Sequence, residues 1–107
     1  MKKGDLVLIS FPFTNLKGKK RRPAVILYKG EIDVVVCFIT SKMNSGEDTD
    51  LYLEPDPSSN NLKVPSLVRT SKIATLEIDL ITGKIGELRK EEIQLLNLKL
   101  RQLFILS

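Results

Sequence analysis

Candidate chemistry in this sequence rests on guanidinium, ammonium and hydroxyl groups. Five basic residues fall within positions 17–22, and no acidic residue lies among them. A compact positive segment of this kind attracts polyanions such as nucleic acid. Thr40 and Ser41 follow an apolar run at positions 34–39, and a hydroxyl group can donate a hydrogen bond to a phosphate oxygen. These residue types therefore favour a site that contacts phosphate groups.

The composition argues against several reaction types. The 107 residues include no histidine and a single cysteine, Cys37. Without histidine, the chain lacks the usual general base near neutral pH and cannot form a Ser-His or Cys-His nucleophile. The same composition argues against a zinc site, so we expect neither a metal nor another cofactor. An enzyme built from these residues would depend on charge stabilisation, as in phosphoryl transfer.

The single cysteine and the apolar segments also bear on location. Cys37 lies within the apolar run at 34–39, which predicts a buried thiol in the core. One cysteine cannot form an internal disulfide, and this fits a reducing compartment. No apolar stretch approaches the roughly 20 residues of a membrane span, and the N-terminal apolar segment is too short for a signal peptide. We therefore expect a cytoplasmic protein without a membrane segment.

The elements that must position these groups are short strands followed by a helix. A length of 107 residues and an apolar fraction of 42% predict one globular domain over 1–107. Apolar, β-rich runs bounded by turn residues predict strands at 5–11, 23–28, 34–39, 51–53, 66–69, 72–76 and 84–88. The runs 66–69 and 72–76 are two strands or one bent strand. The polar segments 42–49 and 54–61 are expected to be surface loops.

The last part of the chain changes to a helical period. Residues 90–106 contain no glycine or proline, and apolar residues recur at helical spacing at 93, 96, 100, 103 and 104. A second apolar edge is formed by Leu95, Leu98 and Ile105. We therefore expect more than one side of the helix to be covered, either by the strands or by a second copy of the chain. The whole pattern is typical of a mainly β protein with a C-terminal helix, as a small barrel or a sandwich.

The runs 23–28 and 34–39 predict a hairpin that brings Arg22 to Thr40. Residues 29–33 have a suitable length for a hairpin loop. A register symmetric about Glu31 gives three opposed pairs: Tyr28 with Val34, Pro23 with Ile39, and Arg22 with Thr40. A guanidinium and a hydroxyl group would then meet at one rim of the sheet and could together hold an RNA phosphate. A shift of one residue would break this alignment.

Five short motifs follow one another along nearly the whole chain. They are Gly4-Asp5-Leu6-Val7 with Phe11-Pro12-Phe13-Thr14, Lys20-Arg21-Arg22-Pro23-Ala24-Val25-Ile26, Cys37-Phe38-Ile39-Thr40-Ser41, Pro65-Ser66-Leu67-Val68-Arg69 with Lys72-Ile73-Ala74-Thr75-Leu76, and Lys84-Ile85-Gly86-Glu87-Leu88 before the closing helix. In this order and spacing they resemble the PemK/MazF toxins of type II toxin–antitoxin systems. The resemblance implies an SH3-like small β-barrel.

The resemblance also implies an activity and its partners. Members of the family are homodimers that cleave single-stranded mRNA at short sequence motifs without a metal ion. The 2′-hydroxyl of the RNA attacks the adjacent phosphate, which gives a 2′,3′-cyclic phosphate and a 5′-hydroxyl, so the protein itself needs no nucleophile. An antitoxin protein blocks the site with a flexible, often acidic segment. RNA, an antitoxin and a second copy of the chain are therefore the implied partners.

Three residues are implied to be catalytic by the resemblance. Arg22 matches the arginine before proline, and Thr40 matches the active-site threonine, with Ser41 as its small polar neighbour. Arg69 matches a second active-site arginine of some members. In those members an aspartate follows two positions later, where this chain has Ser71, so no carboxylate role is implied there. The RNA-binding residues are expected to be Lys17, Lys19, Lys20, Arg21, Ser41 and Ser71.

Other interpretations of the same residues stay open. Arg69 could form a structural ion pair with Glu77 or Asp79, and the run 17–22 could be an ordinary solvated hairpin loop. A DNA gyrase poison of the CcdB type would share the fold but has little use for Arg22 beside Thr40. A non-catalytic RNA-binding module is the third possibility, because Ser71 replaces an acid.

Overall fold

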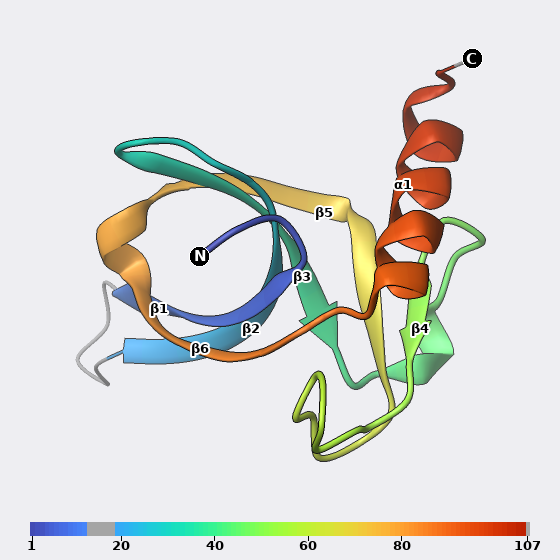
Figure 1. The fold of residues 1–107 in the computed structure, drawn as a ribbon, viewed down its shortest axis with the longest axis horizontal. Helices are drawn as coiled ribbons and strands as arrows, with labels where there is room; N and C mark the ends of the chain where they lie inside the picture. Colours follow the sequence, from blue (N-terminus) through green and yellow to red (C-terminus); the bar gives the residue numbers. More distant parts are fainter. Residues whose placement is uncertain (13–18, 107) are drawn as a thin grey trace.

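The computed structural model describes residues 1–12 and 19–106 of the chain (Figure 1). These residues form six strands and one α-helix: β1 (Asp5–Pro12), β2 (Lys19–Lys29), β3 (Asp33–Thr40), β4 (Leu51–Leu53), β5 (Ser66–Glu77), β6 (Ile81–Glu87) and α1 (Lys90–Phe104). Two short 3-10 helices, η1 (Met43–Ser45) and η2 (Ile78–Leu80), precede β4 and β6. The prediction of a mainly β chain with a C-terminal helix is confirmed.

The strands form one antiparallel sheet in the order β4-β5-β3-β2-β1-β6. The sheet curls strongly, and η2 continues the curl from β5 to β6 (Figure 1). Among the described residues no pairing joins β4 to β6, so the sheet of this small barrel-like fold is open between these two strands. β4 has only three residues, and the end of β6 instead meets the loop after β4, where Glu87 N donates to Ser59 O at 3.0 Å.

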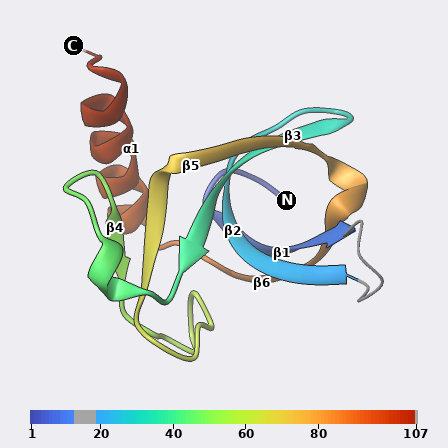
Figure 2. The same ribbon diagram turned by 180° about the vertical axis from the view of Figure 1, so that it is seen from behind.

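Two apolar cores lie on the two faces of the sheet, because successive side chains along a strand point to opposite sides. The core inside the curl is formed by Val7, Ile9, Ala24, Ile26, Val34 and Val36. The core on the other face includes Leu6, Val25, Cys37, Val68 and Leu96. Figures 1 and 2 show that α1 lies beside β4 and β5, and its Leu96 is fully buried. The helix therefore packs on the second core, and none of its described residues belongs to the core inside the curl.

β2 begins four residues earlier than the predicted strand, at Lys19 instead of position 23. The reason is that β1 extends to Pro12 and continues to pair with it, so that Ile9 lies opposite Arg22 and Pro12 opposite Lys19. Residues 19–22 are therefore strand, and the interpretation of the whole basic run as a loop is wrong. The first part of the run, including Lys17, lies outside the described residues.

β5 is a single bent strand, one of the two forms that the sequence allowed. Phe38 of β3 pairs with Arg69, whereas the preceding residue Cys37 pairs with Ile73. Residues 70–72 are therefore extra in β5 at this point, and the irregularity bends the strand. The N-terminal half of β5 packs near β4 and α1, and the C-terminal half follows the curl (Figure 1).

α1 begins after Arg89 and ends two residues before the predicted limit. The Glu92 carboxylate accepts a hydrogen bond from Arg89 N at 2.8 Å and so satisfies a free donor at the start of the helix. Ile105 adopts a left-handed conformation with φ of 56°, which ends the helix. Among the described helices, none combines the length and the apolar character that a membrane crossing needs.

Candidate nucleic-acid interface

The β2–β3 hairpin has the predicted register in its half away from the loop. Ala24 lies opposite Phe38, and Val25 lies opposite Cys37, as symmetry about Glu31 requires. Closer to the loop the register shifts between Ile26 and Tyr28, so the expected pairing of Tyr28 with Val34 is wrong, and its partner is Val35. The correct half is the one that leads to the candidate site.

Arg22 and Thr40 lie on the same face of the sheet, at matching levels of β2 and β3. Ala24 of β2 lies opposite Phe38 of β3. Arg22 lies two positions before Ala24, Thr40 lies two positions after Phe38, and side chains two positions apart on a strand share a face. Both residues line one pocket of about 340 Å³, together with Ser41. The structure therefore places the two residues in the lining of one pocket at this rim, where the sequence predicted that they come together.

The pocket is strongly cationic. Its described lining contains five basic residues, Lys20, Arg21, Arg22, Lys42 and Lys63, and no acidic one. Arg22 is exposed, and among the described residues no carboxylate forms an ion pair with it. Cations grouped around one hollow raise the local concentration of anions. The arrangement can hold a phosphate group or another oxyanion.

The Thr40 hydroxyl is held in a defined direction. Its Oγ1 accepts a hydrogen bond from Lys42 N at 3.1 Å. Because the backbone N–H occupies one acceptor position of the oxygen, the hydroxyl hydrogen stays available for an acceptor in the pocket. Thr40 can therefore act as a donor of fixed position beside Arg22.

Arg69 does not line this pocket in the described structure. It lies opposite Phe38, so it shares a face of the sheet with Arg22, with β3 between them. Arg69 Nε is 3.1 Å from Asp50 Oδ2 without the angle of a hydrogen bond, and a second guanidinium nitrogen is 3.7 Å from Glu47 Oε1. Arg69 therefore does form a structural ion pair, but its partners are Asp50 and Glu47, and the partners that the sequence suggested, Glu77 and Asp79, are wrong.

Asp50 ties this ion pair to the segment after β3. Its side chain is almost fully buried, and its Oδ2 accepts a hydrogen bond from Glu47 N at 2.9 Å. A buried carboxylate needs a compensating charge, and Arg69, whose side chain is 15% exposed, provides it. The segment 42–50 is thus fastened to β5 directly after the pocket residues Thr40, Ser41 and Lys42.

The remaining predicted contacts are distributed unevenly. Lys20, Arg21 and Ser41 line the pocket, as the sequence suggested. Ser71 is exposed but lies in the irregular part of β5, outside the lining. Lys19 is the first residue of β2, and Lys17 lies outside the described residues.

Sequence reasoning missed the far wall of the pocket. Leu62, Lys63 and Val64 come from the chain between β4 and β5, Ser66 is the first residue of β5, and all four line the pocket together with residues of β2 and β3. No motif or periodicity in this segment indicates that it returns to Arg22. Lys42 could have been found more easily, because it follows directly after Thr40 and Ser41.

Cys37 has the buried position that the sequence predicted. It is fully buried, and burial raises the pKa of its thiol to about 12. The reactive thiolate is therefore scarce near neutral pH. Cys37 belongs to the core beneath the site and supplies no nucleophile to it.

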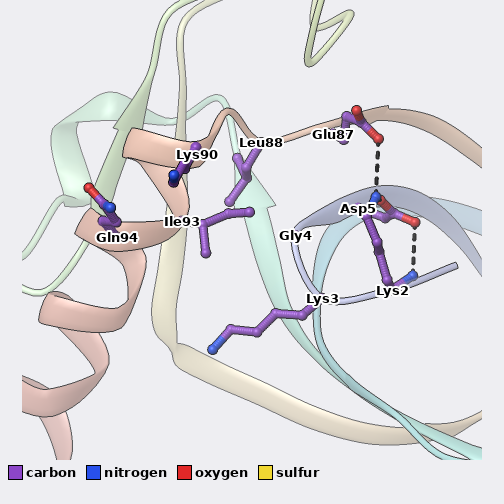
Figure 3. Close-up of a pocket in the computed structure, with 9 residues that line it drawn as sticks. All are labelled: Lys2, Lys3, Gly4, Asp5, Glu87, Leu88, Lys90, Ile93 and Gln94. Carbon is purple, nitrogen blue, oxygen red and sulfur yellow. Dashed lines mark hydrogen bonds and ion pairs between the residues drawn. The ribbon is translucent and has the colours of Figure 1, made fainter.

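A second pocket, of about 390 Å³, lies between the N-terminus and α1 (Figure 3). Its central carboxylate, Asp5, accepts a hydrogen bond from Lys2 N at 2.9 Å and lies within 3.5 Å of Lys84 Nζ. Burial alone would raise the pKa of Asp5, but the Lys2 hydrogen bonds and the charges of Lys2 and Lys84 outweigh it and lower this pKa. The charges are compensated within the network, so it serves to fasten the N-terminus to β6.

Sequence and fold together place the chain in one class of protein, the toxins of type II toxin–antitoxin systems. The family model described as "PemK-like, MazF-like toxin of type II toxin-antitoxin system" matches residues 2–104. The chain therefore belongs to the PemK/MazF-like toxin family. A comparison with curated protein sequences finds no match.

Solved structures of MazF proteins have the same fold. Mycobacterium tuberculosis toxin MazF-mt6 is 22% identical with a TM-score of 0.74, and the match covers 94% of this chain and 98% of that one. MazE-MazF from Deinococcus radiodurans is 18% identical with a TM-score of 0.79, covering 100% and 97%. A mycobacterial endoribonuclease in complex with its cognate antitoxin is 19% identical with a TM-score of 0.76, covering 100% and 97%.

Proposed function

We propose that this toxin is an endoribonuclease that cleaves single-stranded mRNA at specific sequences without a metal ion. The observation that carries this proposal is that Arg22 and Thr40 line the same pocket, whose described lining holds five basic residues and no acidic one. Such a lining fits a polyanionic substrate. The names of related structures agree, since two mycobacterial neighbours are called endoribonucleases.

The proposed reaction uses a nucleophile from the RNA. The 2′-oxygen forms a bond to the adjacent phosphorus and loses its proton to water, and the bond from phosphorus to the 5′-oxygen breaks. The 5′-oxygen takes up a proton, which leaves a 2′,3′-cyclic phosphate and a 5′-hydroxyl. The guanidinium of Arg22 donates to the non-bridging oxygens as negative charge builds on them. Thr40 donates from its fixed position and orients the same phosphate.

Arg69 has a secondary part in this proposal. Its charge is already shared with Asp50 and Glu47. A guanidinium that faces two carboxylates adds less to an anionic transition state than an uncompensated one. We therefore assign the main charge stabilisation to Arg22, and to Arg69 the task of holding the segment 42–50 beside the pocket.

The other basic residues bind the RNA in this account. Lys20 and Arg21 border the pocket, and Lys17 and Lys19 extend the same basic run along the chain. Ser41 adds a hydroxyl group beside Thr40, and Ser71 stays an exposed candidate contact at a distance from the pocket lining. The cations draw in the RNA, and the contribution of each to binding weakens with salt.

An antitoxin and a second copy of the chain are the proposed protein partners in the cytoplasm. A cationic pocket fits an acidic antitoxin segment, and two related structures contain the antitoxin. On α1, Leu95 and Leu98 are exposed, and so is Ile105, which directly follows the helix. An apolar helix face that the described part of the chain leaves exposed favours a homodimer.

The nuclease proposal is tested with purified toxin and single-stranded RNA in the presence of EDTA. We expect fragments with cyclic phosphate and 5′-hydroxyl ends, and we expect Arg22→Ala to abolish them. Lys29→Ala is the matched control, because Lys29 is an exposed cation at the other end of β2. RNA that is retarded on a gel but intact would support a binding module instead. Intact RNA together with gyrase stalled on DNA would support a gyrase poison.

A further inference from the structure

The wall of the pocket opposite Arg22 and Thr40 is built by residues 62–64. This segment joins β4 to β5 and reaches the pocket from outside the hairpin. Its exposed members differ in character, since Lys63 carries a charge whereas Val64 is apolar and 49% exposed. We propose that Lys63 and Val64 form a specificity wall that contacts the base beside the scissile phosphate. This role rests on the proposed nuclease activity and assigns it a determinant of sequence preference.

The wall is anchored by a buried side chain. Asn60 is fully buried, and its Oδ1 accepts hydrogen bonds from Leu62 N at 2.9 Å and from Asp56 N at 3.0 Å. Its Nδ2 donates to Glu54 O at 2.7 Å. A buried amide that is hydrogen-bonded through both its oxygen and its nitrogen fixes the backbone around it. The start of the wall is therefore preorganised before any ligand arrives.

The same segment is clamped from two further sides. Asp56 forms an ion pair with Arg89, which precedes α1. At β6, a Cβ added to Gly86 would lie 2.4 Å from Ser59 O, so only glycine permits this close approach. Ser66 Oγ donates to Val64 O at 3.0 Å and holds the end of the wall. A surface that must discriminate between bases needs this kind of rigid support.

Val64 has no evident structural duty. Its neighbour Leu62 is partly buried and packs against the core beneath α1, whereas half of the surface of Val64 is open. An apolar side chain among five cations leaves a contact area for a flat, weakly polar group while the cations hold phosphates. A nucleobase next to a bound phosphate has this chemistry. Lys63 can add a hydrogen bond to an acceptor atom on the base edge.

The inference is tested with short single-stranded RNAs that differ in one base on either side of the cleaved bond. Cleavage rates and binding affinities are measured for the wild-type toxin, Val64→Thr and Lys63→Ala. We expect both variants to lower the preference for the best base over the poorest one about 10-fold, and we expect Lys63→Ala, which also removes a cation of the pocket, to weaken binding of every RNA. Ile32→Thr is the matched control, because Ile32 is an equally branched apolar residue, 75% exposed, in the β2–β3 loop.

The experiment distinguishes failure of the specificity wall from failure of the proposed nuclease activity. Unchanged base preference in both variants, with RNA still cut, would overturn the specificity wall and leave the nuclease intact. If the wild type cuts none of the RNAs but Val64→Thr and Lys63→Ala alter its base preference in binding, the nuclease proposal fails and the wall stands. Binding without base preference in the wild type would overturn the wall as well. Thermal melting of each variant checks that it is folded.

Discussion

Thr40 lines the pocket and also forms a hydrogen bond with the backbone of the turn after β3. The hydroxyl oxygen accepts a hydrogen bond from Lys42 N and leaves its own hydrogen available, so the same group shapes the turn after β3 and can donate into the pocket. Valine has the same shape as threonine without the oxygen. The two roles of the hydroxyl group can therefore be removed without creating a cavity.

We expect Thr40→Val to lower the rate of RNA cleavage about 100-fold, the usual cost of one donor to a developing oxyanion. Thr40→Ser keeps the oxygen and should stay within about 10-fold of the wild type. Single-turnover cleavage of a short RNA measures both rates. Equal losses in the two variants would show that the hydroxyl group is not the functional part of the side chain.

A second residue-scale prediction concerns the pair of Asp50 and Arg69. Asp50→Asn keeps the shape and an acceptor for Glu47 N but removes the charge that compensates Arg69. We expect a loss of about 2 kcal/mol in the free energy of unfolding, less than for a fully enclosed pair because Glu47 remains beside the guanidinium. Urea denaturation measures it. Asp48→Asn, at an exposed position of the same segment, should change stability by less than about 0.5 kcal/mol.

The β4–β5 connection is the element on which the pocket wall depends. It packs so closely on β6 that a methyl group at Gly86 would collide with two backbone carbonyl oxygens, Ser59 O at 2.4 Å and Asn60 O at 2.5 Å. Backbone atoms cannot move aside as a flexible side chain can. Gly86 is thus the position at which the connection and the sheet constrain each other most tightly.

We expect Gly86→Ala to destabilise the protein by about 2 kcal/mol or more through this overlap. Gly83→Ala is a matched control in the same strand, because no other group lies within 4 Å of a Cβ added there. The control should change the free energy of unfolding by less than about 0.5 kcal/mol. Thermal or urea unfolding of both variants makes the comparison, and equal losses would contradict the packing that the structure shows.

The elements also show where sequence reasoning succeeds. Local apolar patterns predicted the strands and the C-terminal helix, because each is coded by its own period. The pairing level of Arg22 with Thr40 followed from loop symmetry alone. The shift near Tyr28 could not be foreseen, because an extra residue in one strand leaves no mark in the apolar pattern.

Two features of the site depend on contacts between distant segments and were therefore missed. Lys63 and Val64 reach the pocket because Asn60 and Gly86 fold their connection onto β6. Arg69 finds its carboxylates at Asp50 and Glu47, in a segment that the sequence showed only as a polar loop. The open edge of the sheet likewise depends on how far β4 extends.

At the scale of the whole molecule, α1 has one covered face and one open face. Leu96 is buried against the sheet, whereas Leu95 and Leu98 are 43% and 48% exposed. The second apolar edge that the sequence predicted is thus present, and none of residues 1–12 and 19–106 covers it fully. In the proposed homodimer this edge is where the second copy binds.

We expect the wild-type toxin to sediment as a dimer and Leu98→Lys to sediment as a monomer, because a charge on the apolar edge opposes its burial. Ile32→Lys changes an exposed apolar residue in the β2–β3 loop and should leave the dimer intact. Analytical ultracentrifugation over a range of concentrations distinguishes the two states. If the wild-type toxin stays monomeric at all concentrations, the proposed homodimer is wrong.

The central claim is that Arg22 stabilises the cleavage transition state while its neighbours in the basic run bind the RNA. The most direct test compares Arg22→Lys with Lys20→Ala for both RNA affinity and single-turnover cleavage. Arg22→Lys keeps the charge but loses the planar fork, so affinity should change less than about threefold while cleavage falls at least about 100-fold. Lys20→Ala should instead weaken binding and its dependence on salt, with cleavage of bound RNA nearly unchanged. Equal effects of the two substitutions on binding and on cleavage would contradict the claim.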